Sequence, residues 1–256
     1  MKHKIISAVT LAILLLIFFL LRQETYFWFL IFSIAFIYLA AVVYGSSQIK
    51  ANYFVNSINR GKLDAVTFTF DDGPDMELTP KILELLEEEK IKATFFVIGK
   101  KAEQYPELLQ AMSKQGHIIA NHSYSHSNFI GLFSSKKLEG DIERCSKIIE
   151  KAIGDKPLYF RPPFGVTNPR YSNVLKKIGL ISIGWTIRSF DTSVKNNNKL
   201  FERITKSITN GSIILFHDTQ NITVEVLSDI IKFYRQHNVK IVSLPELINL
   251  SPYKNV

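Results

Sequence analysis

The hydrophobic pattern divides the chain into an apolar N-terminal region and a longer region of short alternating elements. Residues 5–21 and 26–44 contain no charged residue, and only the polar residues 22–25 separate them. A helix needs roughly 20 apolar residues to cross a bilayer, with about 17 as the lower bound, so both stretches are long enough. We therefore expect a multi-pass membrane protein in which residues 1–46 form a hairpin of two transmembrane helices.

Each stretch has one other interpretation. Lys2 and Lys4 precede the first stretch as they would in a signal peptide, but the stretch is long for one and no clear cleavage pattern follows it. The second stretch could be a buried core helix. However, aromatic residues lie near both of its ends, namely Tyr26, Phe27, Trp28 and Tyr44. Aromatic residues at these positions suit a membrane interface better than a buried core helix.

From residue 63 to residue 250, strand-like and helix-like segments alternate. Strands are expected at 65–70, 93–98, 117–121, 158–160, 181–186, 212–216 and 240–243. Helices are expected at 79–89, 106–115, 136–153, 169–178, 200–209 and 224–237. Seven successive β-then-α units predict an α/β domain with a parallel sheet, open or closed into a barrel. Residues 47–62 would link this domain to the hairpin, and residues 251–256 would form a tail.

Charge and cysteine content exclude several classes of function. The formal net charge is +8, but the lysines are spread along predicted helices, which indicates solvated helix faces and no nucleic-acid partner. Cys145 is the only cysteine, so an intrachain disulfide and a cysteine-based zinc site are excluded. Its place in the apolar pattern of a helix predicts a small buried hydrophobic residue.

Polar residues follow several of the predicted strands, and in (β/α) barrels the C-terminal ends of the strands carry the chemistry. Asp71 and Asp72 end the first strand, where Gly73 and Pro74 stop the ladder. Adjacent carboxylates repel each other, so either a bound cation or full exposure in a turn must accommodate the pair. A divalent metal is the economical explanation.

After the third strand, His122 and His126 stand four residues apart. This spacing places two imidazoles on one side of a compact turn, and neutral imidazole is a common zinc ligand. A lone loop histidine is usually a surface residue, but a pair at the same sheet edge as Asp71 and Asp72 indicates ligands. Two histidines and one carboxylate would leave a position open for water, as in catalytic zinc sites.

Two further strand ends carry polar groups. Arg161 precedes two prolines that stiffen the backbone, so it could hold a carboxylate while the amides of Phe164 and Gly165 stabilise an oxyanion. Taken alone, this segment is better explained as a surface turn with a solvated arginine. His217 and Asp218 follow the sixth strand, which places a general acid or base at the same rim; the alternative is a capping aspartate beside an incidental histidine.

Together these segments resemble the polysaccharide deacetylase family, the NodB-homology domain of carbohydrate esterase family 4. The resemblance spans about residues 63–250 and rests on four motifs in the family's order and approximate spacing: Thr69-Phe70-Asp71-Asp72-Gly73-Pro74, His122-Ser123-x-x-His126, Arg161-Pro162-Pro163-Phe164 and Leu215-Phe216-His217-Asp218. It implies a distorted (β/α)7 barrel. It also implies a metal-dependent hydrolase that removes acetyl groups from the N-acetylated sugars of a polysaccharide such as peptidoglycan or chitin.

The resemblance implies a role for each motif residue. A divalent metal, zinc before cobalt, nickel or manganese, would be bound by Asp72, His122 and His126. Asp71 would be the catalytic base, and His217 would protonate the departing amine.

The remaining residues would position the reacting groups. Arg161 would orient Asp71, and the Phe164 amide would help to hold the oxyanion. Trp185 and Leu215 would line the pocket for the acetyl methyl group, and Asp191 is expected on the substrate side of the site.

One segment departs from the family pattern. Members usually carry Asp-x-x-Asp-Trp after the fifth strand, whereas this chain has Arg188-Ser189-Phe190-Asp191-Thr192. Arg188 replaces the aspartate that tunes the catalytic histidine, and Thr192 replaces the tryptophan. An arginine near His217 would lower the pKa of its imidazole, and the replacements leave the pH optimum and the substrate subsite open. Phe164 stands where many members have tyrosine.

Two other functions stay open at this stage. An O-acetyl esterase would use the same site, because both reactions share a tetrahedral intermediate. An inactive carbohydrate-binding relative would need no base and acid, which the retention of Asp71 and His217 argues against.

The membrane orientation rests on two opposing signals. Only Arg22 lies between the two apolar stretches, whereas five basic residues flank them on the outside: Lys2, Lys4, Lys50, Arg60 and Lys62. This distribution favours a cytoplasmic location for both flanks. Large domains escape this rule, and acetylated polymers lie outside the membrane. We therefore expect an extracytoplasmic catalytic domain.

Overall fold

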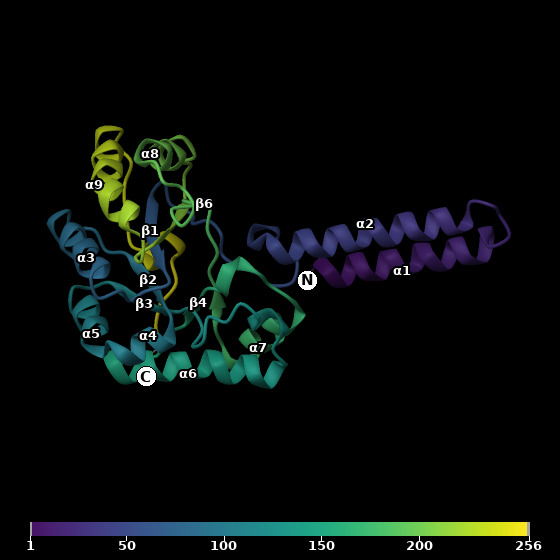
Figure 1. The fold of residues 1–256 in the computed structure, drawn as a ribbon, viewed down its shortest axis with the longest axis horizontal. Helices are drawn as coiled ribbons and strands as arrows, with labels where there is room; N and C mark the ends of the chain where they lie inside the picture. Colours follow the sequence, from purple (N-terminus) through teal and green to yellow (C-terminus); the bar gives the residue numbers. More distant parts are fainter. Residues whose placement is uncertain (1, 255–256) are drawn as a thin grey trace.

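The computed structural model describes residues 2–254 as an apolar helical pair that projects from an α/β domain (Figure 1). Helices α1 (Lys2–Leu21) and α2 (Phe27–Ser47) lie side by side, and Ser7 Oγ lies 2.9 Å from the hydroxyl of Tyr38. Both helices are long and apolar enough to cross a membrane, and almost none of their residues is fully buried. By length and composition they fit transmembrane spans, and α1 also fits a signal sequence.

The α/β domain contains a seven-stranded parallel sheet with the order β5-β4-β3-β2-β1-β7-β6. Its strands are β1 (Val66–Asp71), β2 (Thr94–Val97), β3 (Ile118–Asn121), β4 (Tyr159–Phe160), β5 (Ile181–Ser182), β6 (Ile187–Arg188) and β7 (Ser212–His217). β1 lies centrally, in register with β7, so that Asp71 stands opposite His217. The sheet curves into a half-barrel, which confirms the expected fold class.

Two strand predictions were wrong in detail. The run 181–186 does not form one strand, because it divides into β5 and β6, which lie at opposite edges of the sheet. The residues between them cross the open side of the half-barrel, where the Gly184 amide donates to the Ile58 carbonyl (2.9 Å). The run 240–243 makes only an isolated bridge from Ile241 to Val66, so the seventh strand is β6.

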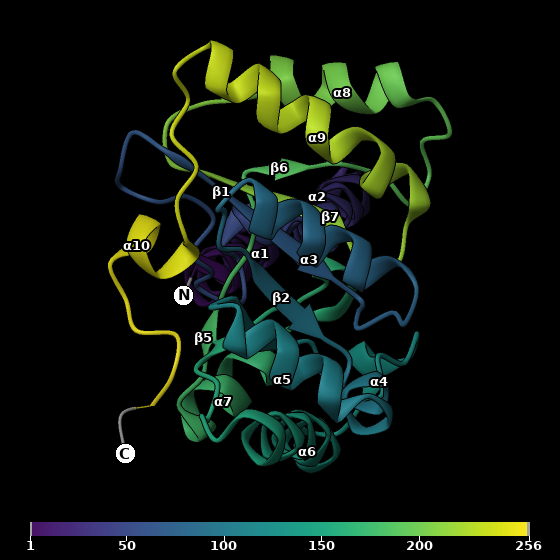
Figure 2. The ribbon, with the colours of Figure 1, turned by 90° about the vertical axis from the view of Figure 1, so that its left-hand side faces the viewer.

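Helices surround the sheet in the order expected from the sequence (Figure 2). They are α3 (Leu78–Glu88), α4 (Gly99–Gln104), α5 (Pro106–Lys114), α6 (Ser135–Ile153), α7 (Pro169–Ile178), α8 (Asn197–Lys206), α9 (Asn221–Gln236) and α10 (Leu244–Ile248). Their ends follow local chemistry: Ser134 caps the start of α6 by accepting from the Lys137 amide, and Gly154 ends α6 in the left-handed conformation. The short helices α4 and α10 were not expected.

Strand alternation decides which side chains reach the site. Phe68 and Phe70 of β1 point into the core between sheet and helices, where Phe70 stacks on Phe95 (5.0 Å between centroids). Because neighbouring side chains on a strand point to opposite faces, Thr69 and Asp71 point into the half-barrel. The buried Cys145 belongs to the same outer core, as expected.

The segment expected to be a simple linker is folded onto the domain. Ile49, Tyr53, Phe54 and Val55 are each less than 9% exposed and belong to two core clusters. Ile58 then pairs with β5, because its amide donates to the Ser182 carbonyl (2.9 Å). The connection between α2 and β1 therefore packs as part of the α/β domain.

Candidate active site

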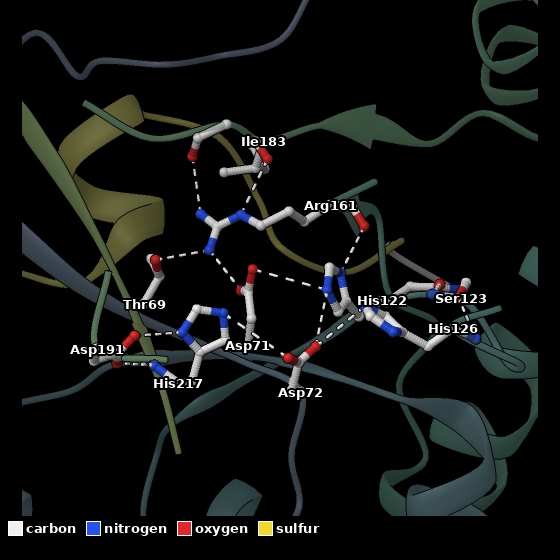
Figure 3. Close-up of polar contacts among 12 residues, drawn as sticks. Thr69, Asp71, Asp72, His122, Ser123, His126, Arg161, Ile183, Asp191 and His217 are labelled. Atoms are coloured by element: carbon white, nitrogen blue, oxygen red, sulfur yellow. Dashed lines mark hydrogen bonds and ion pairs between the residues drawn. The ribbon is translucent and has the colours of Figure 1, made fainter. Parts of the chain in front are cut away.

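The end of β1 turns its two carboxylates toward different partners (Figure 3). Asp71 lies within the half-barrel and is 3% exposed. Asp72 has a φ angle of 73°, in the left-handed region that non-glycine residues seldom adopt. This backbone turn directs the Asp72 carboxylate toward His122 and His126, away from the partner of Asp71.

Asp72, His122 and His126 form a group that fits a divalent metal. Asp72 Oδ1 lies 3.4 Å from His122 Nε2 and 3.2 Å from His126 Nε2, and it is buried without a hydrogen-bond donor. His122 Nδ1 donates to the Arg161 carbonyl (2.8 Å), which leaves the lone pair of Nε2 facing the carboxylate. Acceptor atoms that converge in this way are compatible with a cation between them, as the sequence analysis expected.

The surroundings keep His126 and Asp72 in the protonation states that ligands need. Burial, followed by the neighbouring His122, lowers the pKa of His126 to about 4, so its imidazole is neutral at pH 7. Burial alone would raise the pKa of Asp72, but the imidazoles of His122, His126 and His217 outweigh it and hold that pKa well below its usual range. A neutral imidazole and an ionised carboxylate are both typical zinc donors.

Arg161 is fully buried and organises the centre of the site (Figure 3). One terminal nitrogen donates to Asp71 Oδ1 (2.7 Å) and to Thr69 Oγ1 (2.9 Å). The rest of the guanidinium donates to the carbonyls of Ile183 (3.2 Å) and Gly184 (2.8 Å). Arg161 thus orients Asp71 through its side chain and His122 through its carbonyl.

His217 lies across β1 from Arg161 and is held by Asp191. The His217 Nδ1–H donates to Asp191 Oδ1 (2.6 Å), and Asp191 Oδ2 accepts from the His217 amide and the Thr223 hydroxyl (2.7 Å each). Nε2 therefore faces the site, 3.9 Å from Asp72 Oδ2. Burial would lower the pKa of His217, but the hydrogen bond and charge of Asp191 outweigh it and raise that pKa.

Two expectations for this segment were wrong. Asp191 is not on the substrate side, because it is 1% exposed and lies behind His217. The pKa of His217 is raised rather than lowered, because Asp191 is hydrogen-bonded to it whereas the Arg188 guanidinium lies over Trp185 and Phe190. Arg188 stands at the sequence position of the family's aspartate, but its guanidinium points toward Trp185 and Phe190.

A pocket of about 260 Å³ joins these groups. Its polar wall holds both carboxylates and three histidines, and its other wall is formed by Phe164, Gly165, Trp185, Arg188, Thr192 and Leu215. Gly165 has a φ angle of 69°, and a Cβ added there would lie 2.3 Å from Trp185 Cη2, so only glycine fits. The Gly165 amide donates to the Pro162 carbonyl (3.0 Å), which leaves the Phe164 amide as the oxyanion candidate.

The sequence analysis missed two residues of the site. Thr69 accepts from Arg161 and stands two residues before Asp71, so strand alternation was a signal that could have found it. Thr223 donates to Asp191 from the first turn of α9, and no local pattern points to that contact. The structure otherwise brings the predicted ligands, the predicted base and the predicted acid into one pocket.

Comparison with known proteins is consistent with this geometry. The family model described as polysaccharide deacetylase matches residues 59–183. A peptidoglycan-N-acetylglucosamine deacetylase of Bacillus cereus is 34% identical over 188 residues, which cover 72% of this chain and 87% of that protein. The chain belongs to the polysaccharide deacetylase family.

Other relatives and solved structures extend the match. A chitooligosaccharide deacetylase of Azorhizobium caulinodans is 34% identical over 155 residues, which cover 60% of this chain and 73% of that protein. The crystal structure of the Bc1960 peptidoglycan N-acetylglucosamine deacetylase superposes with a TM-score of 0.74 at 28% identity, covering 77% of this chain and 95% of that one. These matches confirm the resemblance and the fold, and they make this chain a polysaccharide deacetylase, a hydrolase of carbon–nitrogen bonds.

Proposed function

We propose that this polysaccharide deacetylase is metal-dependent and hydrolyses the acetamide group of N-acetylated sugars in a peptidoglycan- or chitin-like chain. One observation carries the proposal. A carboxylate held by a buried arginine and a histidine held by a buried aspartate flank the group Asp72, His122 and His126 in a single pocket. Binding alone would not require such a pair of proton-transfer groups.

The metal group and Asp71 together account for attack on the acetyl carbon. A divalent metal bound by Asp72, His122 and His126, zinc before cobalt, nickel or manganese, would lower the pKa of water and polarise the acetyl carbonyl. Arg161 holds Asp71 Oδ1, so Oδ2 faces the site, 3.8 Å from His122 Nε2. Asp71 therefore acts as the base that accepts the proton of the attacking water.

His217 accounts for departure of the amine. Its Nε2 faces the pocket and donates a proton to the sugar nitrogen as the carbon–nitrogen bond breaks, which releases acetate and a free amino sugar. Asp191 keeps the other proton on Nδ1 and raises the pKa of the imidazole, so the protonated form persists closer to neutral pH. Phe164, Trp185 and Leu215 shape the pocket for the acetyl group.

The choice of N-acetyl over O-acetyl substrate rests on the relatives and on His217. The relatives are named for deacetylation of N-acetylglucosamine or chitooligosaccharide. An amine is a poor leaving group unless it is protonated, and the site supplies that acid. Release of acetate from acetylated xylan alone would instead favour an O-acetyl esterase.

We further propose that residues 1–46 anchor the chain as two membrane spans and that the catalytic domain, residues 63–250, faces outward. The exposed apolar surfaces of α1 and α2 support a bilayer as their surroundings. Protease added to intact spheroplasts should then digest the domain. Digestion only after permeabilisation would contradict the outward orientation.

The function is tested by acetate release from the full chain in detergent with zinc added, on chitin oligosaccharides, peptidoglycan and acetylated xylan. Asp71→Asn should lower kcat by about 10² to 10⁴, the usual contribution of general-base catalysis, while the zinc content stays at one per chain. His122→Ala should lower both kcat and the zinc content. Asp64→Asn, an exposed carboxylate just before β1, is the matched control. Wild-type activity in Asp71→Asn would refute the assignment.

A further inference from the structure

A second pocket, of about 440 Å³, adjoins the catalytic pocket. Three parts of the chain form it: the end of α2 with the turn that follows, the β6 region, and α8. Trp185 and Arg188 line both pockets, so the two share a wall. A ligand in the second pocket therefore lies directly beside the catalytic groups.

The second pocket is strongly cationic. Lys50, Arg188 and Arg203 line it, and no acidic residue does. Within residues 2–254, none of these three forms an ion pair with a carboxylate. Backbone carbonyls hold two of them instead: Lys50 Nζ donates to the Thr186 carbonyl, and Arg203 Nε donates to the Arg188 carbonyl (2.8 Å). Such anchors fix the position of a cation without neutralising its charge.

The two arginines are also fixed by an aromatic ring. The guanidinium carbons of Arg188 and Arg203 lie 4.9 Å and 4.3 Å from the centroid of Phe190. Phe190 has a φ angle of 60°, a conformation that phenylalanine seldom adopts. Lys50 lines the same pocket close to these arginines, because burial and then the charges of Arg60 and Arg203 lower its pKa. Planar guanidinium groups presented in this way suit the oxygens of a phosphate.

The position of this pocket relative to the apolar helices indicates the source of such a phosphate. Ser47, the last residue of α2, and Gln48 line the pocket. Figure 1 shows that the helical pair leaves the α/β domain from this end of α2. If α2 crosses a bilayer, the pocket lies at the membrane surface, at the depth of lipid phosphates, and a lipid chain attached to that phosphate can run beside the helix.

We infer that the second pocket binds the phosphate or diphosphate of a lipid-linked N-acetylated sugar and thereby places the sugar in the catalytic pocket. This inference rests on the proposed deacetylase function and specifies its substrate. A neutral polysaccharide makes no use of three uncompensated cations. The inference also gives Arg188 a function at the position where the sequence departs from the family pattern.

The test compares three substrates that carry one N-acetylglucosamine each, using the full chain in detergent with zinc added. They are its farnesyl diphosphate ester, its soluble methyl phosphodiester and its neutral octyl glycoside. We expect kcat/KM for the farnesyl diphosphate ester to exceed that for the octyl glycoside at least about tenfold, mainly through KM. Sodium chloride at high concentration should reduce this advantage because it screens the cations.

Variants connect the advantage to the pocket. The quantity compared is the kcat/KM for the farnesyl diphosphate ester divided by that for the octyl glycoside. Lys50→Gln and Arg203→Gln should each reduce this ratio about threefold or more, and the double variant should bring it close to one. Lys206→Gln is the matched control, because it removes an exposed charge one turn further along α8 and should leave the ratio unchanged. Using the ratio separates loss of phosphate binding from partial unfolding, since unfolding lowers both values alike.

Each result decides a separate question. Equal kcat/KM values for the farnesyl diphosphate ester and the octyl glycoside overturn the inference. If the soluble methyl phosphodiester shows the same increase in kcat/KM over the octyl glycoside, the inference that the bound phosphate belongs to a lipid is overturned. Cleavage of chitin oligosaccharides or peptidoglycan without cleavage of the farnesyl ester overturns the inference and leaves the deacetylase function standing. Acetate release from none of these substrates refutes the deacetylase function itself.

Discussion

Replacing Arg161 with methionine removes the only cation paired with Asp71 among residues 2–254 apart from the histidines of the site. Methionine is apolar and matches the aliphatic part of arginine, but it ends where Nε stands, so it also loses the contact of the guanidinium carbon with Phe96, 4.0 Å from the ring centroid. Breaking a buried ion pair costs about 3–5 kcal/mol, because the remaining charge stays buried. The carbonyls of Ile183 and Gly184 also lose their donor, so we expect Arg161→Met to lower the free energy of unfolding by at least about 4 kcal/mol.

A double-mutant cycle isolates the pairing from the packing. Asp71→Asn alone leaves the guanidinium buried beside a neutral group, whereas Asp71→Asn with Arg161→Met leaves no buried charge. The double variant should therefore lose about 2–3 kcal/mol less than the sum of the two single variants. Urea unfolding in a Trp28→Phe background, followed by the fluorescence of Trp185, measures each free energy. Losses that add to within about 0.5 kcal/mol would refute the coupling of the two residues.

Three further predictions concern other parts of the domain. Burial lowers the pKa of His117 from 6.5 to about 4. The contribution of its neutral form to the free energy of unfolding is therefore complete above pH 6.5 and falls by about 3 kcal/mol between pH 6.5 and 4. His117→Asn should flatten this decline, measured as urea midpoints against pH, and an unchanged profile would contradict the prediction. Gly165→Ala should lower activity and stability more than Gly154→Ala, since both have positive φ but only Gly165 faces Trp185; equal losses would show that backbone strain alone is responsible. His126→Ala should weaken zinc binding measured by calorimetry at least tenfold, and wild-type affinity would exclude it as a ligand.

The sequence predicts those parts of the fold that have a long periodic signal. β1 and β7 span six residues each and were found almost to the residue, because β1 alternates clearly and β7 is a continuous apolar run. β5 and β6 contain two residues each, which is too short for any periodicity, so one apolar run was taken for a single strand. The run 240–243 has the composition of a strand, but it meets the sheet at β1, whose two sides are already paired with β2 and β7, so it makes only one bridge.

The candidate site was predictable where each residue follows a strand. Asp71, Asp72 and His217 end central strands, so parallel topology alone brings them together. Asp191 was misplaced because its role depends on a loop that returns beneath His217, and no local pattern encodes that return. The direction of Arg188 was missed for the same reason, since Phe190 and α8 set it.

The open side of the half-barrel has a practical consequence for the part of the chain that can fold alone. Ile58 pairs with β5, Arg60 bridges to Ser212, and the Gly61 amide donates to the Gly211 carbonyl (2.8 Å). A shortened chain that starts at residue 63 would leave these sheet groups bare, and bare strand edges promote aggregation. The minimal folding unit therefore begins before Ile49, so soluble expression calls for a cut between α2 and Ile49.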